Sequence, residues 1–85
     1  MIAVRCYGHI CTSVGKDEVL LDAAEIDASD LVDRVRALAN DRDPGFTRYN
    51  TLVMIQDGEA FVPAGSRRVV RGDVKVALVP FSHGG

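Results

Sequence analysis

The segment from Asp27 to Asn40 carries the clearest helical pattern in the chain, and it most restricts the possible folds. Its apolar residues recur at helical spacing and form one stripe: Ala28, Leu31, Val32, Val35, Leu38 and Ala39. Asp27 can cap the N-terminus, the acidic Asp30 suits the positive end of the helix dipole, and Asn40 is a suitable end. A helix of this kind must bury its stripe against another layer of structure.

The other apolar segments alternate in the manner of strands. We expect strands over residues 2–7, 19–23, 51–56, 59–63 and 74–81. Residues 8–18 form a polar, glycine-bracketed connection with room for one short helical turn, and residues 64–70 are expected to be irregular. Residues 57–58, an Asp-Gly pair, are typical of a hairpin turn, and a second turn is expected at 71–73.

One helix among several strands, without regular β–α–β alternation, predicts an α+β domain with a mixed sheet of about four to five strands. The helix is expected to pack on one face of this sheet. Its stripe should meet the following sheet residues: Val4, Val19, Leu21, Val53, Ile55, Val74, Val76 and Leu78. At 85 residues the chain is long enough for one domain with a single core.

The opposite face of the predicted sheet keeps an apolar set that one helix cannot cover. Alternation places these residues there: Leu52, Met54, Ala77, Val79 and Phe81. An uncovered apolar patch is typical of a binding surface. The alternative is that the loop at 57–73 folds over the patch and makes it part of the core. We favour a docking surface.

Charge and composition argue against several function classes. The net charge is −2 and the arginines are interleaved with aspartates, so a direct nucleic-acid partner is not expected. No apolar run approaches the length of a membrane span, and the first residues lack the pattern of a signal peptide. We therefore expect a cytoplasmic protein without a membrane partner.

The residues that commonly carry catalysis or bind metals form no recognisable pattern. Cys6 and Cys11 match neither a Cys-x-x-Cys motif nor a zinc spacing, and only His9 and His83 could complete a site. We expect no metal and two reduced thiols. There is no glycine-rich phosphate loop and no Ser or Cys triad arrangement, so an independent enzyme is not expected.

The chain ends on ALVPFSHGG, an apolar run and a proline followed by a short tail. The terminal pair Gly84-Gly85 is either chance or the sign of a carboxylate that must reach a narrow site. Glycine suits the second use, because it has no Cβ to meet the wall of a tunnel. We predict a domain over residues 1–81 and a flexible tail over residues 82–85.

Three stretches of the chain carry a family pattern: MIAVRCYGHICTSVGKD, DASDLVDRVRAL and RGDVKVALVPFSHGG. The first resembles the opening of the small subunit of molybdopterin synthase, and the second resembles its acid-capped helix. The third is similar to its ending, in which Gly-Asp introduces the last strand and a proline precedes a Gly-Gly tail. The resemblance to these MoaD/ThiS-type sulfur carriers covers essentially the whole chain and implies a ubiquitin-like β-grasp fold.

The resemblance also implies a chemistry for the tail. A ubiquitin-activating-type adenylating enzyme uses ATP to attach AMP to the carboxylate of Gly85, and a sulfur donor then displaces AMP to leave a thiocarboxylate. Gly84 is the spacer, Ser82 and His83 lead into it, and Pro80 limits the entropy that is lost when the tail is ordered. The chain itself binds no cofactor and acts as the sulfur-donating, non-catalytic subunit of a synthase complex.

The partners implied are the adenylating enzyme and the large subunit of molybdopterin synthase. The residues expected to bind them lie along the tail and on the sheet face opposite the helix, which we call the open face: Leu52, Met54, Ala77, Val79, Pro80, Phe81, Ser82 and His83. Other carriers remain open, because a histidine third from the end also resembles the ubiquitin-related modifier that serves tRNA thiolation or lysine conjugation. Thiamine-type and cysteine-type carriers, and a non-catalytic β-grasp interaction module, are further alternatives.

Overall fold

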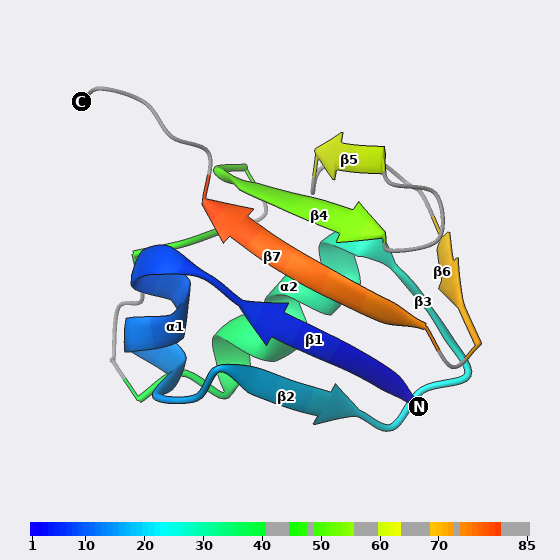
Figure 1. Cartoon of the computed structure of the whole chain (residues 1–85), viewed down its shortest axis with the longest axis horizontal. Helices are drawn as coiled ribbons and strands as arrows, with labels where there is room; N and C mark the ends of the chain where they lie inside the picture. The colour runs from blue at the N-terminus through cyan, green and yellow to red at the C-terminus, as the bar shows by residue number, and fades with distance from the viewer. Residues whose placement is uncertain (41–44, 48, 56–59, 64–68, 73, 81–85) are drawn as a thin grey trace.

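The computed structural model describes residues 1–40, 45–47, 49–55, 60–63, 69–72 and 74–80, except for the side chains of residues 60–63. Its elements in chain order are β1 (Ile2–Cys6), α1 (Gly8–Val14), β2 (Glu18–Leu21), β3 (Glu25–Asp27), α2 (Ala28–Ala37), β4 (Thr51–Ile55), β5 (Ala60–Pro63), β6 (Val69–Arg71) and β7 (Lys75–Pro80). Figure 1 shows the large sheet as one layer, with α2 crossing behind it.

Five of these strands form one mixed sheet in the order β2-β1-β7-β4-β5. β1 and β7 run parallel, with Val4 opposite Val76, and the other neighbours are antiparallel. β7 therefore lies at the middle of the sheet, between strands from the two halves of the chain (Figure 1). The predicted α+β class with a mixed sheet and a helix on one face is confirmed.

Helix α2 buries its apolar stripe against the large sheet. Ala28, Leu31, Val32 and Val35 are buried, and the carboxylate of Asp27 accepts a hydrogen bond from the backbone N–H of Ser29 at 2.9 Å, as expected of an N-cap. The sheet contributes these residues to the same core: Ile2, Val4, Cys6, Val19, Leu21, Val53, Ile55, Val76 and Leu78. Val74 is partly buried against the core, so the predicted helix-side set is confirmed.

Leu38 is a correction to the predicted stripe, because its side chain is 51% exposed. The helix ends at Ala37, and the backbone N–H of Leu38 donates to the carbonyl of Val35 at 3.0 Å. This three-residue step tightens the last turn relative to an α-helix and turns Leu38 away from the stripe.

The connection after β1 contains more helix than its polar composition indicates. α1 has seven residues rather than one turn, and it buries Ile10 and Val14 in the core that α2 and the sheet form. Its end is joined to the end of α2, since the backbone N–H of Asn40 donates to the carbonyl of Ser13 at 2.9 Å.

Two further features differ from the sequence expectations. β6 occupies part of the stretch expected to be irregular, and it pairs with β3 so that Ile26 lies opposite the buried Val70. Strands of three residues are too short to show an alternating pattern. Phe46, in the expected loop between α2 and β4, is fully buried, and its carbonyl accepts a 3.0 Å hydrogen bond from Nε of Arg36.

β5 pairs antiparallel with β4, as the predicted return strand should. The Asp-Gly pair at 57–58 and most of the loop at 57–73 lie outside the described residues. Covering of the open face by that loop therefore stays an alternative prediction.

Candidate functional site: the open sheet face and the root of the tail

The predicted reacting residue Gly85 lies outside the described residues, as do Gly84, Ser82, His83 and Phe81. The proposed boundary between domain and tail falls in the same stretch. The structure does describe Pro80, the residue that immediately precedes this stretch and the last residue of β7. The site can therefore be built from the open face up to that residue.

Pro80 is placed by the strand on one side and by the turn between β1 and α1 on the other. It lies opposite the fully buried Thr51 in the antiparallel pairing of β4 with β7. The backbone N–H of Tyr7 donates to the carbonyl of Leu78 at 3.2 Å. This hydrogen bond continues the pairing of β1 with β7 one residue past the end of β1. The next residue, Gly8, lies close to the proline ring: a Cβ added to Gly8 would be 3.0 Å from Cγ of Pro80.

The open face brings together four of the predicted docking residues. Leu52 lies opposite Val79, and Met54 lies opposite Ala77, in the register of β4 with β7. Leu52, Met54 and Val79 are partly buried, whereas Ala77 is only 5% exposed. The small side chain of Ala77 lies between larger neighbours, because Arg5 on β1 and Met54 on β4 are its partners in register.

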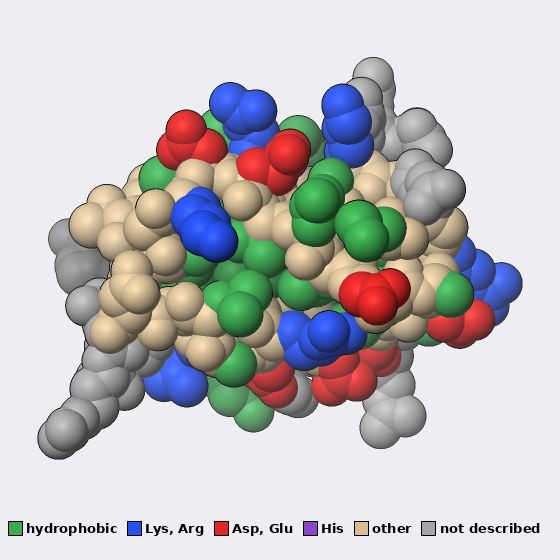
Figure 2. Space-filling model, turned by 90° about the horizontal axis from the view of Figure 1, so that it is seen from below, with side chains coloured by type: hydrophobic (Ala, Val, Ile, Leu, Met, Phe, Trp, Pro, Cys, Tyr) green, Lys and Arg blue, Asp and Glu red, His purple; other side chains and the backbone are tan. Residues whose placement is uncertain are grey.

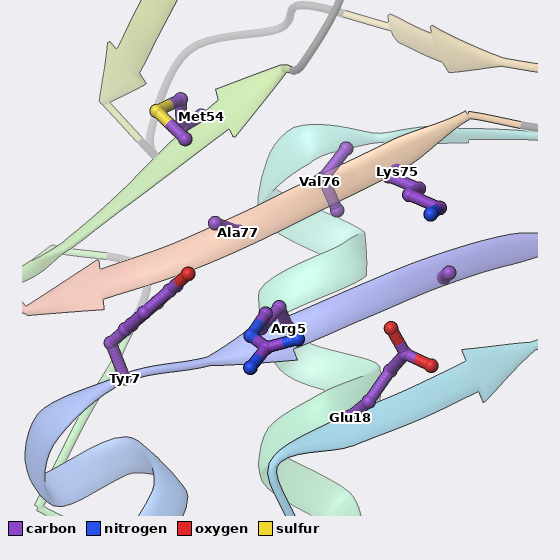
Figure 3. A pocket seen from close by; sticks show the side chains of 8 residues that line it. Arg5, Tyr7, Glu18, Met54, Lys75, Val76 and Ala77 are labelled. Atoms are coloured by element: carbon purple, nitrogen blue, oxygen red, sulfur yellow. The ribbon is translucent and has the colours of Figure 1, made fainter.

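A depression of about 280 Å³ lies on this face and extends the apolar set toward β1 and β2. It is lined by Ala3, Arg5, Tyr7, Glu18, Met54, Lys75, Val76 and Ala77. Figure 3 shows Arg5, Glu18 and Lys75 on neighbouring strands, and Tyr7 extending from the end of β1 toward β7. Small residues in the middle of the face and long ones around them create this shape.

Sequence reasoning missed the charged and phenolic residues of this depression. Alternation in β1 does put Ala3, Arg5 and Tyr7 on the side away from Val4. Nothing in the local pattern shows that β1 lies beside β7, so these residues were not joined to Met54 and Ala77. The parallel pairing of β1 with β7 is what joins them.

A second depression, of about 240 Å³, lies where the two helices end near the start of β2. It is lined by Val14, Gly15, Lys16, Val19, Leu38 and Asn40. Figure 2 shows the side of the molecule that carries the β2 edge, where hydrophobic side chains gather among Lys, Arg, Asp and Glu. Lys16 is the charged residue of the depression's lining, and the others are apolar or neutral.

Neither thiol has the environment of a reactive cysteine. Burial raises the pKa of the Cys6 thiol to about 11, with smaller contributions from Cys11 and Asp17. The pKa of Cys11 is raised as well, chiefly because its Sγ donates a hydrogen bond to the carboxylate of Asp17 at 3.1 Å. Nucleophilic thiols have lowered pKa values, so both are expected to be protonated at neutral pH.

The described residues hold no cluster of His, Cys, Asp and Glu that could bind a metal ion, and none of their helices is long and apolar enough to cross a membrane. No protein-family model matches the sequence, and no curated protein is significantly similar to it.

Proposed function

We propose that this chain is a ubiquitin-like β-grasp sulfur carrier, in which the carboxylate of Gly85 is converted to a thiocarboxylate. The observation that carries the proposal is the position of β7. The strand that precedes the Phe-Ser-His-Gly-Gly ending lies in the middle of the sheet and is anchored on both sides up to Pro80. A terminal segment on a firmly held central strand is suited to carry a reacting group into a partner's site.

The chemistry begins at a carboxylate, which is a poor acyl donor until its oxygen becomes part of a good leaving group. An adenylating enzyme joins the Gly85 carboxylate to the α-phosphate of ATP and releases pyrophosphate. A reduced sulfur nucleophile from a donor then attacks the acyl carbon, and AMP leaves. The carrier contributes no acid, base or metal to these steps, and ATP binds to the adenylating enzyme.

The adenylating enzyme is the occupant that the open face fits best. An enzyme that receives the residues after Pro80 must contact the end of the sheet where β7 stops, and the open face leads directly to that end. Leu52, Met54 and Val79 supply partly exposed apolar contacts there. Arg5 and Lys75 outnumber Glu18 among the charged residues of the depression, and this excess of positive charge favours an acidic surface on the enzyme.

The sulfur acceptor that we favour is the large subunit of molybdopterin synthase, in agreement with the opening, helix and ending of the sequence. A sulfur carrier for tRNA thiolation, or a modifier whose Gly85 acyl group is joined to lysine amines, is the second candidate, because His83 stands third from the end. The activation chemistry is common to both. The acceptor can be identified by offering the loaded carrier to each partner separately and measuring which one removes its sulfur.

Loading is tested by incubating the chain with an adenylating enzyme of this class, ATP and a sulfur donor, followed by intact mass measurement. The expected product has one oxygen replaced by sulfur. Deleting Gly85 should abolish the conversion without changing the melting temperature. Cys6→Ser and Cys11→Ser are the matched controls and should load like the wild type wherever they remain folded. Loss of loading in a folded Cys11→Ser variant would make that thiol the carrier instead.

A further inference from the structure

Gly8 is in an unusual position at the end of the sheet from which the tail begins. Its φ is +58°, in the left-handed region that side chains disfavour, and a Cβ added to it would lie 3.0 Å from Cγ of Pro80. Such a distance is tighter than nine in ten real Cβ contacts, so Pro80 would have to move by a few tenths of an ångström. Gly72 offers a direct comparison, because its φ is +76° but a Cβ there would meet nothing within 4 Å.

The difference between the two glycines lies in what they contact. At Gly72 only the backbone conformation requires glycine. At Gly8 the absence of a side chain also lets Pro80 approach the turn after β1. The proline ring cannot rotate away as a flexible side chain can, because it is closed onto its own backbone nitrogen. A group placed at position 8 therefore pushes on the backbone at the end of β7.

We propose that Gly8 is a positioning residue for sulfur loading, and that its close contact with Pro80 sets the position of this last described residue of β7. This role rests on the proposed function. Pro80 is held from the other side by its pairing with the buried Thr51, so a shift at Gly8 cannot be absorbed by a free strand end. Acyl activation needs the carboxylate aligned with ATP. A misplacement of the order of 1 Å can slow a reaction roughly a hundredfold, so a displacement of a few tenths of an ångström is expected to cost about tenfold or less.

The test compares Gly8→Ala with Gly72→Ala in ATP–pyrophosphate exchange by the adenylating enzyme. Both variants strain the backbone, and Gly8→Ala adds the contact with Pro80, so Gly8→Ala should lose at least as much stability as Gly72→Ala in thermal melts. Only Gly8→Ala should lower kcat for adenylate formation, by about tenfold, with KM for the carrier changed less than about twofold. In a Pro80→Ala background, Gly8→Ala should have no further effect on kcat, because the ring that it displaces is gone.

A structural measurement accompanies the kinetics. Amide resonances of Thr51 and Val79 should shift in Gly8→Ala and stay in place in Gly72→Ala. A folded Gly8→Ala variant that loads at the wild-type rate would overturn the positioning role and leave the proposed function intact. If Gly8→Ala does not fold, a Pro80→Ala variant that loads at the wild-type rate overturns it in the same way. A wild-type chain that the enzyme does not adenylate would overturn both.

Discussion

The two faces of the large sheet differ in what their side chains do, although the same strands supply both. In β4, Val53 is fully buried under α2, while its neighbour Met54 is partly exposed on the opposite side. Because successive side chains of a strand point to opposite faces of the sheet, adjacent residues lie in different environments. The helix side holds the fold together, and we propose the open side as the surface that a partner binds.

The faces also differ in composition. The helix side consists of apolar side chains that interlock with Leu31, Val32 and Val35 of α2. The open side combines small residues with charged ones, as at Ala77 beside Arg5. A close-packed core tolerates little change in volume or charge, whereas a shallow, mixed surface tolerates both. The following predictions use this difference.

The largest effect is expected from a charge placed on the helix side. Val53→Asp buries a carboxylate without a partner, which costs several kcal/mol and approaches the whole stability of a small domain. The variant should be unfolded by circular dichroism at room temperature. Met54→Asp, one residue along the strand, is the matched control and should change the free energy of unfolding by less than about 1 kcal/mol. Equal destabilisation of the two variants would show that the open face is also covered.

A smaller effect is expected from Cys6, a buried member of the helix side. Its thiol has a pKa of about 11 when folded, above the ordinary value of 9.0 expected for the unfolded chain. Between these values the unfolded state has lost the proton that the folded state keeps, so stability should fall as pH rises from 9 to 11. The loss should be roughly 2 kcal/mol or less.

Urea unfolding of the wild type and Cys6→Ala across this pH range measures the effect. The Cys6→Ala variant should have a lower free energy of unfolding throughout. It should lack the part of the fall between pH 9 and 11 that the Cys6 thiol causes. Cys11→Ala serves as a control and should keep most of this part, because burial is the main cause of the raised Cys6 pKa and Cys11 is a smaller one. Parallel curves for the wild type and Cys6→Ala would show that the Cys6 thiol does not titrate in this way.

The smallest effect is expected on the open face and concerns binding rather than folding. Met54→Asp should weaken the complex with the adenylating enzyme by about tenfold, or about 1.4 kcal/mol, because it places a charge in an apolar contact. Titration calorimetry with the purified enzyme measures it. Leu38→Asp is the control, since Leu38 is an exposed apolar residue away from this face. If Leu38→Asp weakens binding and Met54→Asp does not, the enzyme docks near the second depression.

Local patterns were sufficient for several elements and misleading for others. The cap at Asp27, the buried stripe from Ala28 to Val35 and the alternation of β1 and β4 are visible in the sequence and confirmed in the structure. Leu38 was misplaced because a tightened turn changes the helical spacing at the end of α2. The pair of β3 with β6 and the burial of Phe46 have no periodic pattern, so only contacts distant in sequence reveal them.

The sequence by itself determined which residues lie on the same side of each strand and helix, because side-chain periodicity is a local property of the backbone. The tertiary structure decided which strands are neighbours. Pairing of β1 with β7 joins Arg5 and Ala77, and the turn after β1 brings Gly8 against Pro80. Both contacts close a loop of nearly the whole chain, and the packing of the entire core, rather than any local pattern, compensates the entropy of that closure.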